Sequence, residues 1–92
     1  MAITRTWKVY GRSGHRQGES FEPSVRYDFS DDHDGVRIIE VLNSDKTGTN
    51  DYAIISITRN TSAECAREFD GQISDGVFEN YNIGRIEEIT EV

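Results

Sequence analysis

The stretch YAIISITRNTSAECAREFDGQISDG, residues 52–76, contains both kinds of element from which this chain is built. Its first part, residues 52–59, is rich in β-branched side chains, Ile54, Ile55 and Ile57 among them, which favours a β-strand. At residue 60 the pattern changes to that of a helix. The junction predicts a strand followed directly by a helix that crosses a sheet.

The helical part begins with a recognisable start signal. Thr61 and Glu64 have the spacing of a capping box, in which each side chain satisfies the backbone N–H of the other residue. Gly71 weakens the helix by roughly 1 kcal/mol relative to alanine, and Gly76 is the expected C-terminal cap. Apolar residues recur at every fourth position and form the stripe of an amphipathic helix. They are Cys65, Phe69, Ile73 and Val77.

Three further stretches upstream predict strands, namely residues 3–10, 24–30 and 36–42. In the first, Ile3, Trp7 and Val9 share one face with Arg5, which is the two-residue period of a strand. Residues 36–42, VRIIEVL, are apolar on both faces, so we expect a central strand that is covered on both sides. Between the second and third stretches, Asp34-Gly35 is a strong hairpin signal.

Residues 83–92 predict a last strand, although Ile83, Ile86 and Ile89 recur at every third position. A β-bulge at Glu87-Glu88, or a short helix, gives the same spacing. The order β-β-β-β-α-β predicts an α+β fold: a four-stranded antiparallel meander, one helix packed on the sheet and a C-terminal fifth strand. The whole chain, 1–92, forms a single domain.

One helix covers one face of a sheet, which leaves apolar residues on the other. If Trp7, Ile39 or Tyr10 is exposed there, a partner or a homodimer is expected.

Composition limits the function further. The formal net charge is -7 and the pI is about 4.7, so general attraction to DNA, RNA or anionic lipid is not expected. The single cysteine, Cys65, excludes an internal disulfide and favours a reducing compartment. No apolar run approaches the ~18 residues of a membrane span. We therefore expect a cytoplasmic protein.

Charge is sorted along the chain. Residues 1–18 hold four bases and no acid, whereas residues 64–92 hold eight acids against two bases, Arg67 and Arg85. The acids are Glu64, Glu68, Asp70, Asp75, Glu79, Glu87, Glu88 and Glu91. One hypothesis is an acidic surface that imitates the phosphates of a nucleic acid and occupies a basic groove on another protein. The alternative is a solvated helix face with a charged edge strand that prevents aggregation.

The loop GRSGHRQG, residues 11–18, is the second candidate site. Its glycines allow close approach of an anion, and arginine binds phosphate with two parallel hydrogen bonds. The candidate ligand-binding residues are Gly11, Arg12, Gly14, His15 and Arg16. The spacing matches neither a P-loop nor a dinucleotide fingerprint. A basic hairpin tip without a ligand is the alternative.

No residues are assigned to catalysis, to a metal or to a cofactor. The acidic turn Asp31–Gly35 suggests a calcium loop, but Ser30 and Val41 stand where an EF-hand needs acids. Cys65 lies near a helix start, where a thiolate is stabilised, yet its place on the apolar stripe predicts a buried thiol. We expect a protein that is not an enzyme.

In overall character the chain resembles small anti-defence proteins of phages and mobile elements, including anti-CRISPR proteins. The shared traits are a short chain, an acidic pI, a compact α+β fold and no catalytic motif. The resemblance implies that the chain masks a surface on a nuclease complex, imitates DNA or sequesters a signalling nucleotide. The leading hypothesis is an inhibitor of a host CRISPR-type nuclease complex that acts through its acidic surface. The alternatives are a nucleotide binder that uses the 11–18 loop and an assembly protein that dimerises through its sheet.

Overall fold

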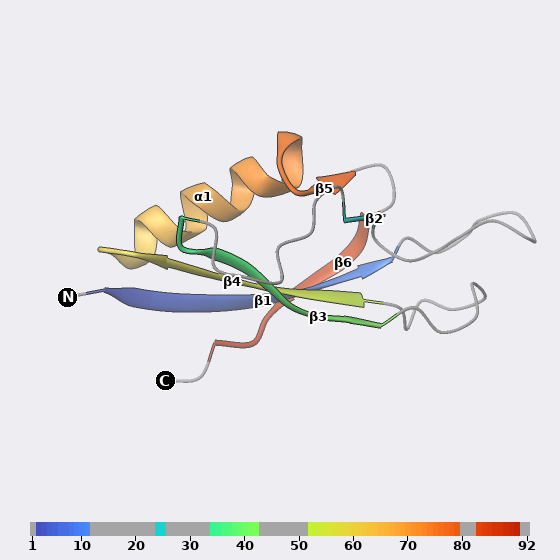
Figure 1. Cartoon of the computed structure of the whole chain (residues 1–92), viewed down its shortest axis with the longest axis horizontal. Helices are drawn as coiled ribbons and strands as arrows, with labels where there is room; N and C mark the ends of the chain where they lie inside the picture. Colours follow the sequence, from blue (N-terminus) through green and yellow to red (C-terminus); the bar gives the residue numbers. More distant parts are fainter. Residues whose placement is uncertain (1, 12–23, 26–33, 43–51, 80–82, 91–92) are drawn as a thin grey trace, which may run out of the picture.

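The computed structural model describes residues 2–11, 24–25, 34–42, 52–79 and 83–90, which form an α+β fold (Figure 1). Four strands make an antiparallel sheet in the order β3-β4-β1-β6. They are β1 (Ile3–Gly11), β3 (Val36–Leu42), β4 (Tyr52–Arg59) and β6 (Ile83–Glu88). The helix α1 (Ser62–Asp75) lies across one side of this sheet. Two short strands, β2 (Ser24–Val25) and β5 (Phe78–Glu79), pair with each other in a second sheet.

The strand order corrects the predicted meander. Strand β1 lies between β4 and β6, and the C-terminal strand is the fourth member of the main sheet rather than a fifth strand beside it. In the predicted strand 24–30, Ser24 and Val25 pair with β5 instead of β1, and residues 26–30 lie outside the described residues. Because α1 carries the chain across the sheet, the last strand can fill the side of β1 that β4 leaves open.

Among the strands that the structure describes, β3 lies at the edge of the sheet, so the expectation of a central strand over residues 36–42 is wrong there. Its register with β4 shifts between Ile38 and Glu40, which inserts Ile39 as an extra residue. An inserted residue reverses the alternation of faces beyond it. The sequence of β3 therefore looks apolar on both faces because the bulge shifts the alternation of side chains, and not because both faces of the strand are buried.

A second bulge explains the three-residue spacing of the C-terminal isoleucines. Val9 pairs with Ile86 and Gly11 pairs with Ile83, so two residues of β6, Gly84 and Arg85, stand opposite one residue of β1. The predicted bulge at Glu87-Glu88 is therefore displaced toward the start of the strand. Glu87 and Glu88 pair in regular register with Lys8 and Trp7.

The core lies between α1 and the face of the sheet that it covers. Trp7 is 5% exposed, and its ring stacks on that of Phe69 at 4.2 Å between centroids and 8° between planes. Aromatic pairs of this kind contribute about 0.5–1.5 kcal/mol beyond the area they bury. The remaining buried core residues are Val9, Val36, Ala53, Ile55, Ile57, Cys65, Val77 and Phe78.

The helix begins at the predicted cap residue Thr61, although the Glu64 carboxylate bonds to the Thr61 hydroxyl and not, as predicted, to its backbone N–H. The backbone N–H of Glu64 donates to the hydroxyl of the N-cap residue Thr61 at 3.2 Å, and that hydroxyl donates to the Glu64 carboxylate at 2.9 Å. Gly76 is the C-cap, and its N–H donates to the carbonyl of Gln72. These contacts satisfy backbone groups that a helix terminus otherwise leaves unpaired.

Candidate functional site

An ion pair between the two chain-terminal strands is the first feature of the charged surface. The guanidinium of Arg5 donates to both carboxylate oxygens of Glu88, from Nε at 2.7 Å and from Nη2 at 2.5 Å. Its Nη1 donates to the Ser62 carbonyl at 2.9 Å, and its centre lies 4.9 Å from the Trp7 ring centroid. Arg5 therefore connects β6, the start of α1 and the aromatic core.

The pair changes the acidity of both groups. The hydrogen bonds from Arg5, and then the one from the Thr90 hydroxyl, lower the pKa of Glu88 from 4.5 to about 2. The same hydrogen bond to Glu88 raises the pKa of Arg5 above its ordinary value. Charge-assisted, two-pronged hydrogen bonds favour the ionised forms on both sides.

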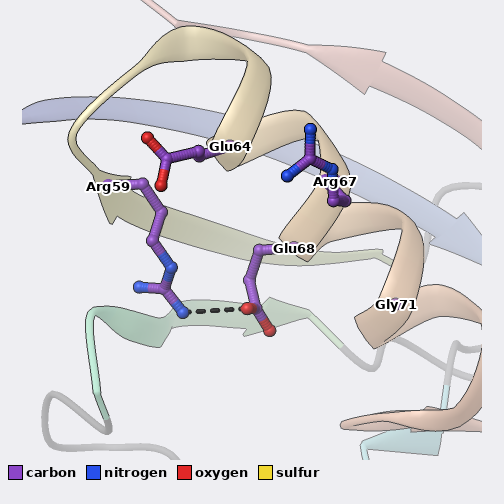
Figure 2. Close-up of a pocket in the computed structure, with 5 residues that line it drawn as sticks. All are labelled: Arg59, Glu64, Arg67, Glu68 and Gly71. Atoms are coloured by element: carbon purple, nitrogen blue, oxygen red, sulfur yellow. Dashed lines mark hydrogen bonds and ion pairs between the residues drawn. The ribbon is translucent and has the colours of Figure 1, made fainter.

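A shallow pocket of about 250 Å³ lies between the end of β4 and the exposed side of α1, and its lining residues are drawn in Figure 2. Arg59 reaches from the end of β4 to Glu68, with Nη2 and Oε1 2.9 Å apart. Arg59 also donates to the carbonyls of Asp34 and Thr58. The hydrogen bond from Gln72, and next the one from Arg59, lower the pKa of Glu68.

The pocket's two carboxylates have structural partners: Glu68 holds β4, and Glu64 belongs to the helix cap. Arg67, the other charged residue that lines the pocket, has no hydrogen bond or ion pair with the part of the chain that the structure describes. A nucleophile with an adjacent base is not among the five lining residues. The Arg59–Glu68 contact in the wall of the pocket joins α1 to β4.

The sheet face opposite α1 carries a row of aromatic and cationic side chains. Lys8 Nζ lies 4.1 Å from the ring centroid of Tyr52 and 5.1 Å from that of Tyr10. The Arg85 guanidinium lies 4.2 Å from the Tyr10 centroid, and the two tyrosine rings meet edge-on at 6.2 Å. Contacts of this type contribute about 0.5–1 kcal/mol each at exposed sites. We call these four residues the tyrosine row.

Glu40 ends this row at strand β3. The Tyr52 hydroxyl donates to its carboxylate at 2.6 Å, and this bond raises the pKa of Tyr52. The row therefore crosses β6, β1, β4 and β3. In the sequence, the alternation of Lys8 and Tyr10 with Trp7 and Val9 indicated that Lys8 and Tyr10 share a face of β1. Which side chains of the neighbouring strands they contact follows only from the strand register.

The fold distributes the predicted acidic surface over several elements. Glu64, Glu68 and Asp70 lie on α1, with Asp75 as its last residue. Glu87 forms an ion pair with Arg85 at 3.1 Å, whereas its neighbour Glu88 binds Arg5. Because successive residues of a strand point to opposite faces, Glu87 and Glu88 do not share a surface. The remaining acids are Glu79, at the end of β5, and Glu91, which lies outside the described residues.

The predicted anion-binding loop lies almost entirely outside the described residues. Gly11 is described and is the buried last residue of β1. The others, Arg12, Gly14, His15 and Arg16, are not among the described residues, and neither is the acidic turn before Asp34. The loop stays a prediction.

The expectation that Cys65 is buried is confirmed. Its side chain is fully enclosed, and Sγ lies 3.4 Å from the carbonyl oxygens of Ile3 and Ile57. Among the described residues, no three His, Cys, Asp or Glu side chains gather as metal ligands. The described helix is too short and too polar to cross a bilayer.

Comparisons with known proteins add nothing to this site, because no family model, curated protein or solved structure matches the chain. What the described surface offers is charge, exposed apolar residues at the sheet edges and a row of tyrosines.

Proposed function

We propose that this chain is a non-enzymatic binding protein and that the acidic residues of α1 are the surface it presents to a basic protein groove. The partner class that fits is a nucleic-acid-binding nuclease complex of a host, which the chain inhibits by occupying the groove. A groove that holds phosphates carries arginines and lysines, and opposite charge steers and orients the encounter.

The observation that carries the proposal is which acidic residues already bind an arginine within the molecule and which do not. Three of them are paired with arginines inside the molecule, in the contacts Arg5–Glu88, Arg59–Glu68 and Arg85–Glu87. On the exposed side of α1, Glu64 and Asp70 have no basic partner among the described residues. These two carboxylates can therefore meet a partner's cations without breaking an internal ion pair.

The internal ion pairs also decide which acidic residues are suited to a mutational test of the surface. Reversing Glu68 or Glu88 removes a contact between elements of the fold, so a loss of binding there does not separate recognition from stability. Among the described residues, the Glu64 carboxylate bonds only to the N-cap hydroxyl of the same helix, and Asp70 has no side-chain bond, so their reversal keeps the contacts between α1 and the sheet. Glu87→Lys, on the opposite side of the sheet, is a control in which one acid rather than two is reversed.

The test begins with affinity capture from a host lysate at low and moderate salt, using the wild-type chain as bait. The proposal requires a nucleic-acid-binding nuclease complex that salt releases. The double variant Glu64→Lys/Asp70→Lys is expected to lose about 10- to 100-fold in affinity for this complex, whereas Glu87→Lys leaves the affinity nearly unchanged. Equal binding by both variants contradicts the proposal, as does capture of no such complex.

A further inference from the structure

Strand β3 is an edge of the sheet with unusually apolar exposure. Ile39, Val41 and Leu42 are 48%, 44% and 39% exposed. On the side away from β4, β3 pairs with no other strand in the described ranges. An exposed edge of this kind is a template for pairing with another strand unless charges or bulges prevent it.

The bulge at Ile39 gives β3 a self-complementary order of side chains. Arg37 pairs with Ser56 and Glu40 pairs with Ile54, and these two residues of β4 are two positions apart. Arg37 and Glu40 therefore lie on the same face, although they are three positions apart in sequence.

Val36 and Val41 share the other face in the same way, since they pair with Ile57 and Ala53. Read from either end, the six residues 36–41 present valine, a charged residue, isoleucine, isoleucine, a charged residue of opposite sign, and valine.

We propose that a second copy of this chain pairs antiparallel with β3 around a two-fold axis between Ile38 and Ile39. In this register Arg37 of each chain stands opposite Glu40 of the other, and Val36 stands opposite Val41. The two sheets join into one of eight strands with both helices on the same side. An isologous contact of this type needs one patch that is complementary to itself, which residues 36–41 supply.

The charges of β3 favour a copy of the same chain as the occupant. Arg37 has no ion pair or hydrogen bond with any residue that the structure describes, while Glu40 is held in place by the Tyr52 hydroxyl at 2.6 Å. Each chain thus offers one cation that has no partner among the described residues and one oriented carboxylate. Opposite charges directly across a strand pair stabilise it, and like charges destabilise it.

The other edge of the described sheet, β6, also has a bulge, at Gly84-Arg85, and an exposed isoleucine, Ile86, but it differs from β3 in its charges. Its acids Glu87 and Glu88 are consecutive, and repeated like charges are a device by which edge strands avoid pairing. The self-complementary charges of β3 therefore select it as the edge that pairs. Pairing through β3 does not depend on the function proposed for α1.

Sedimentation equilibrium of the full chain at tens of micromolar tests the proposal. The expected mass is twice the 10.5 kDa of one chain. Arg37→Glu and Glu40→Arg each place like charges opposite each other at two positions, so each weakens the dimer about tenfold or more. Arg67→Glu makes the same charge change as Arg37→Glu on the exposed side of α1 and leaves the dimer intact.

A mixture of the two single variants tests the register of the proposed dimer. In an equimolar mixture of Arg37→Glu and Glu40→Arg, both cross-strand pairs become opposite in sign again, and the mass returns to that of a dimer. The double variant Arg37→Glu/Glu40→Arg recovers for the same reason. A monomeric wild type, a dimer that withstands both reversals, or a mixture that stays monomeric overturns the proposal. Circular dichroism checks that each variant is folded. If Glu40→Arg does not fold, the comparison of dimer affinity between Arg37→Glu and its control Arg67→Glu decides the proposal.

Discussion

Arg5 and Glu88 are 83 positions apart in sequence, yet two hydrogen bonds of 2.7 and 2.5 Å join their side chains. They meet because β1 and β6 are neighbours in the sheet. Lys8 and Glu87 stand directly opposite each other in the same pair of strands. The charge that is sorted along the sequence is therefore partly recombined in space, where basic β1 lies beside acidic β6.

This ion pair predicts a pH dependence of stability. The folded state lowers the pKa of Glu88 from 4.5 to about 2, so the folded protein binds the proton more weakly than the unfolded chain. Such a group stabilises the fold fully above its unfolded pKa, and the contribution is lost as the pH falls from about 4.5 through about 2.

Urea denaturation between pH 6 and 2 measures this effect. The difference in unfolding free energy between the wild type and Glu88→Gln is expected to shrink toward zero at the acidic end. Glu87→Gln is the control, because its ion pair with Arg85 is solvent-exposed and contributes little. A difference that stays constant over the whole range contradicts the assignment.

Substitution by alanine is expected to change the stability of the protein in opposite directions at two glycines. Gly35 has φ +79°, and a Cβ there would lie 2.5 Å from Arg59 Nη1 and 2.7 Å from the Thr58 carbonyl oxygen. Gly35→Ala should therefore destabilise the protein by about 1–3 kcal/mol. A Cβ at Gly71, on the exposed side of α1, meets no atom within 4 Å, so Gly71→Ala should stabilise by about 0.5–1 kcal/mol. Thermal unfolding of both variants checks the signs, and a shared sign is inconsistent with the described backbone.

The N-cap of α1 is expected to contribute about 1 kcal/mol. Thr61→Ala removes the hydroxyl that accepts from the Glu64 N–H at 3.2 Å, which leaves a helix-terminal donor without its side-chain partner. Thr61→Ser keeps the hydroxyl and should retain most of the stability. Chemical denaturation of the two variants compares them directly, and equal losses would mean that the methyl group, not the cap, matters.

The stacked pair in the core predicts the largest loss. Phe69 is 6% exposed and packs on Trp7, so Phe69→Ala should cost about 3–5 kcal/mol. Trp7 is the single tryptophan of the chain, and its fluorescence reports the unfolding. Ile86→Ala, at a side chain that is 40% exposed, should change stability by about 0.5 kcal/mol or less. Similar losses in the two variants would contradict the placement of the core.

Local structure was predictable because it depends on neighbouring residues. The capping pair Thr61 and Glu64, the stripe through Cys65 and Phe69, and the strand at 52–59 all appear in the structure where the sequence pattern places them. The α+β class follows from the same periodicities. These features need no knowledge of which strands lie side by side.

The arrangement of strands was not predictable from periodicity alone. A two-residue period identifies a strand but not its neighbours, so β6 beside β1 replaced the expected meander. One inserted residue, such as Ile39, moves every later side chain to the other face, which made an edge strand look central. The tyrosine row was missed for the same reason, since Tyr10 and Tyr52 meet only through the register of β1 and β4.

The most direct test of the proposed function is a competition measurement. The chain is titrated into the captured nuclease complex bound to fluorescent duplex DNA, at two salt concentrations. A groove-occupying acidic surface predicts that the chain displaces the DNA, that salt weakens its binding, and that Glu64→Lys/Asp70→Lys fails to displace it while Glu87→Lys succeeds. DNA that stays bound while the chain also binds, or displacement by all variants alike, would contradict the proposal that α1 occupies the groove.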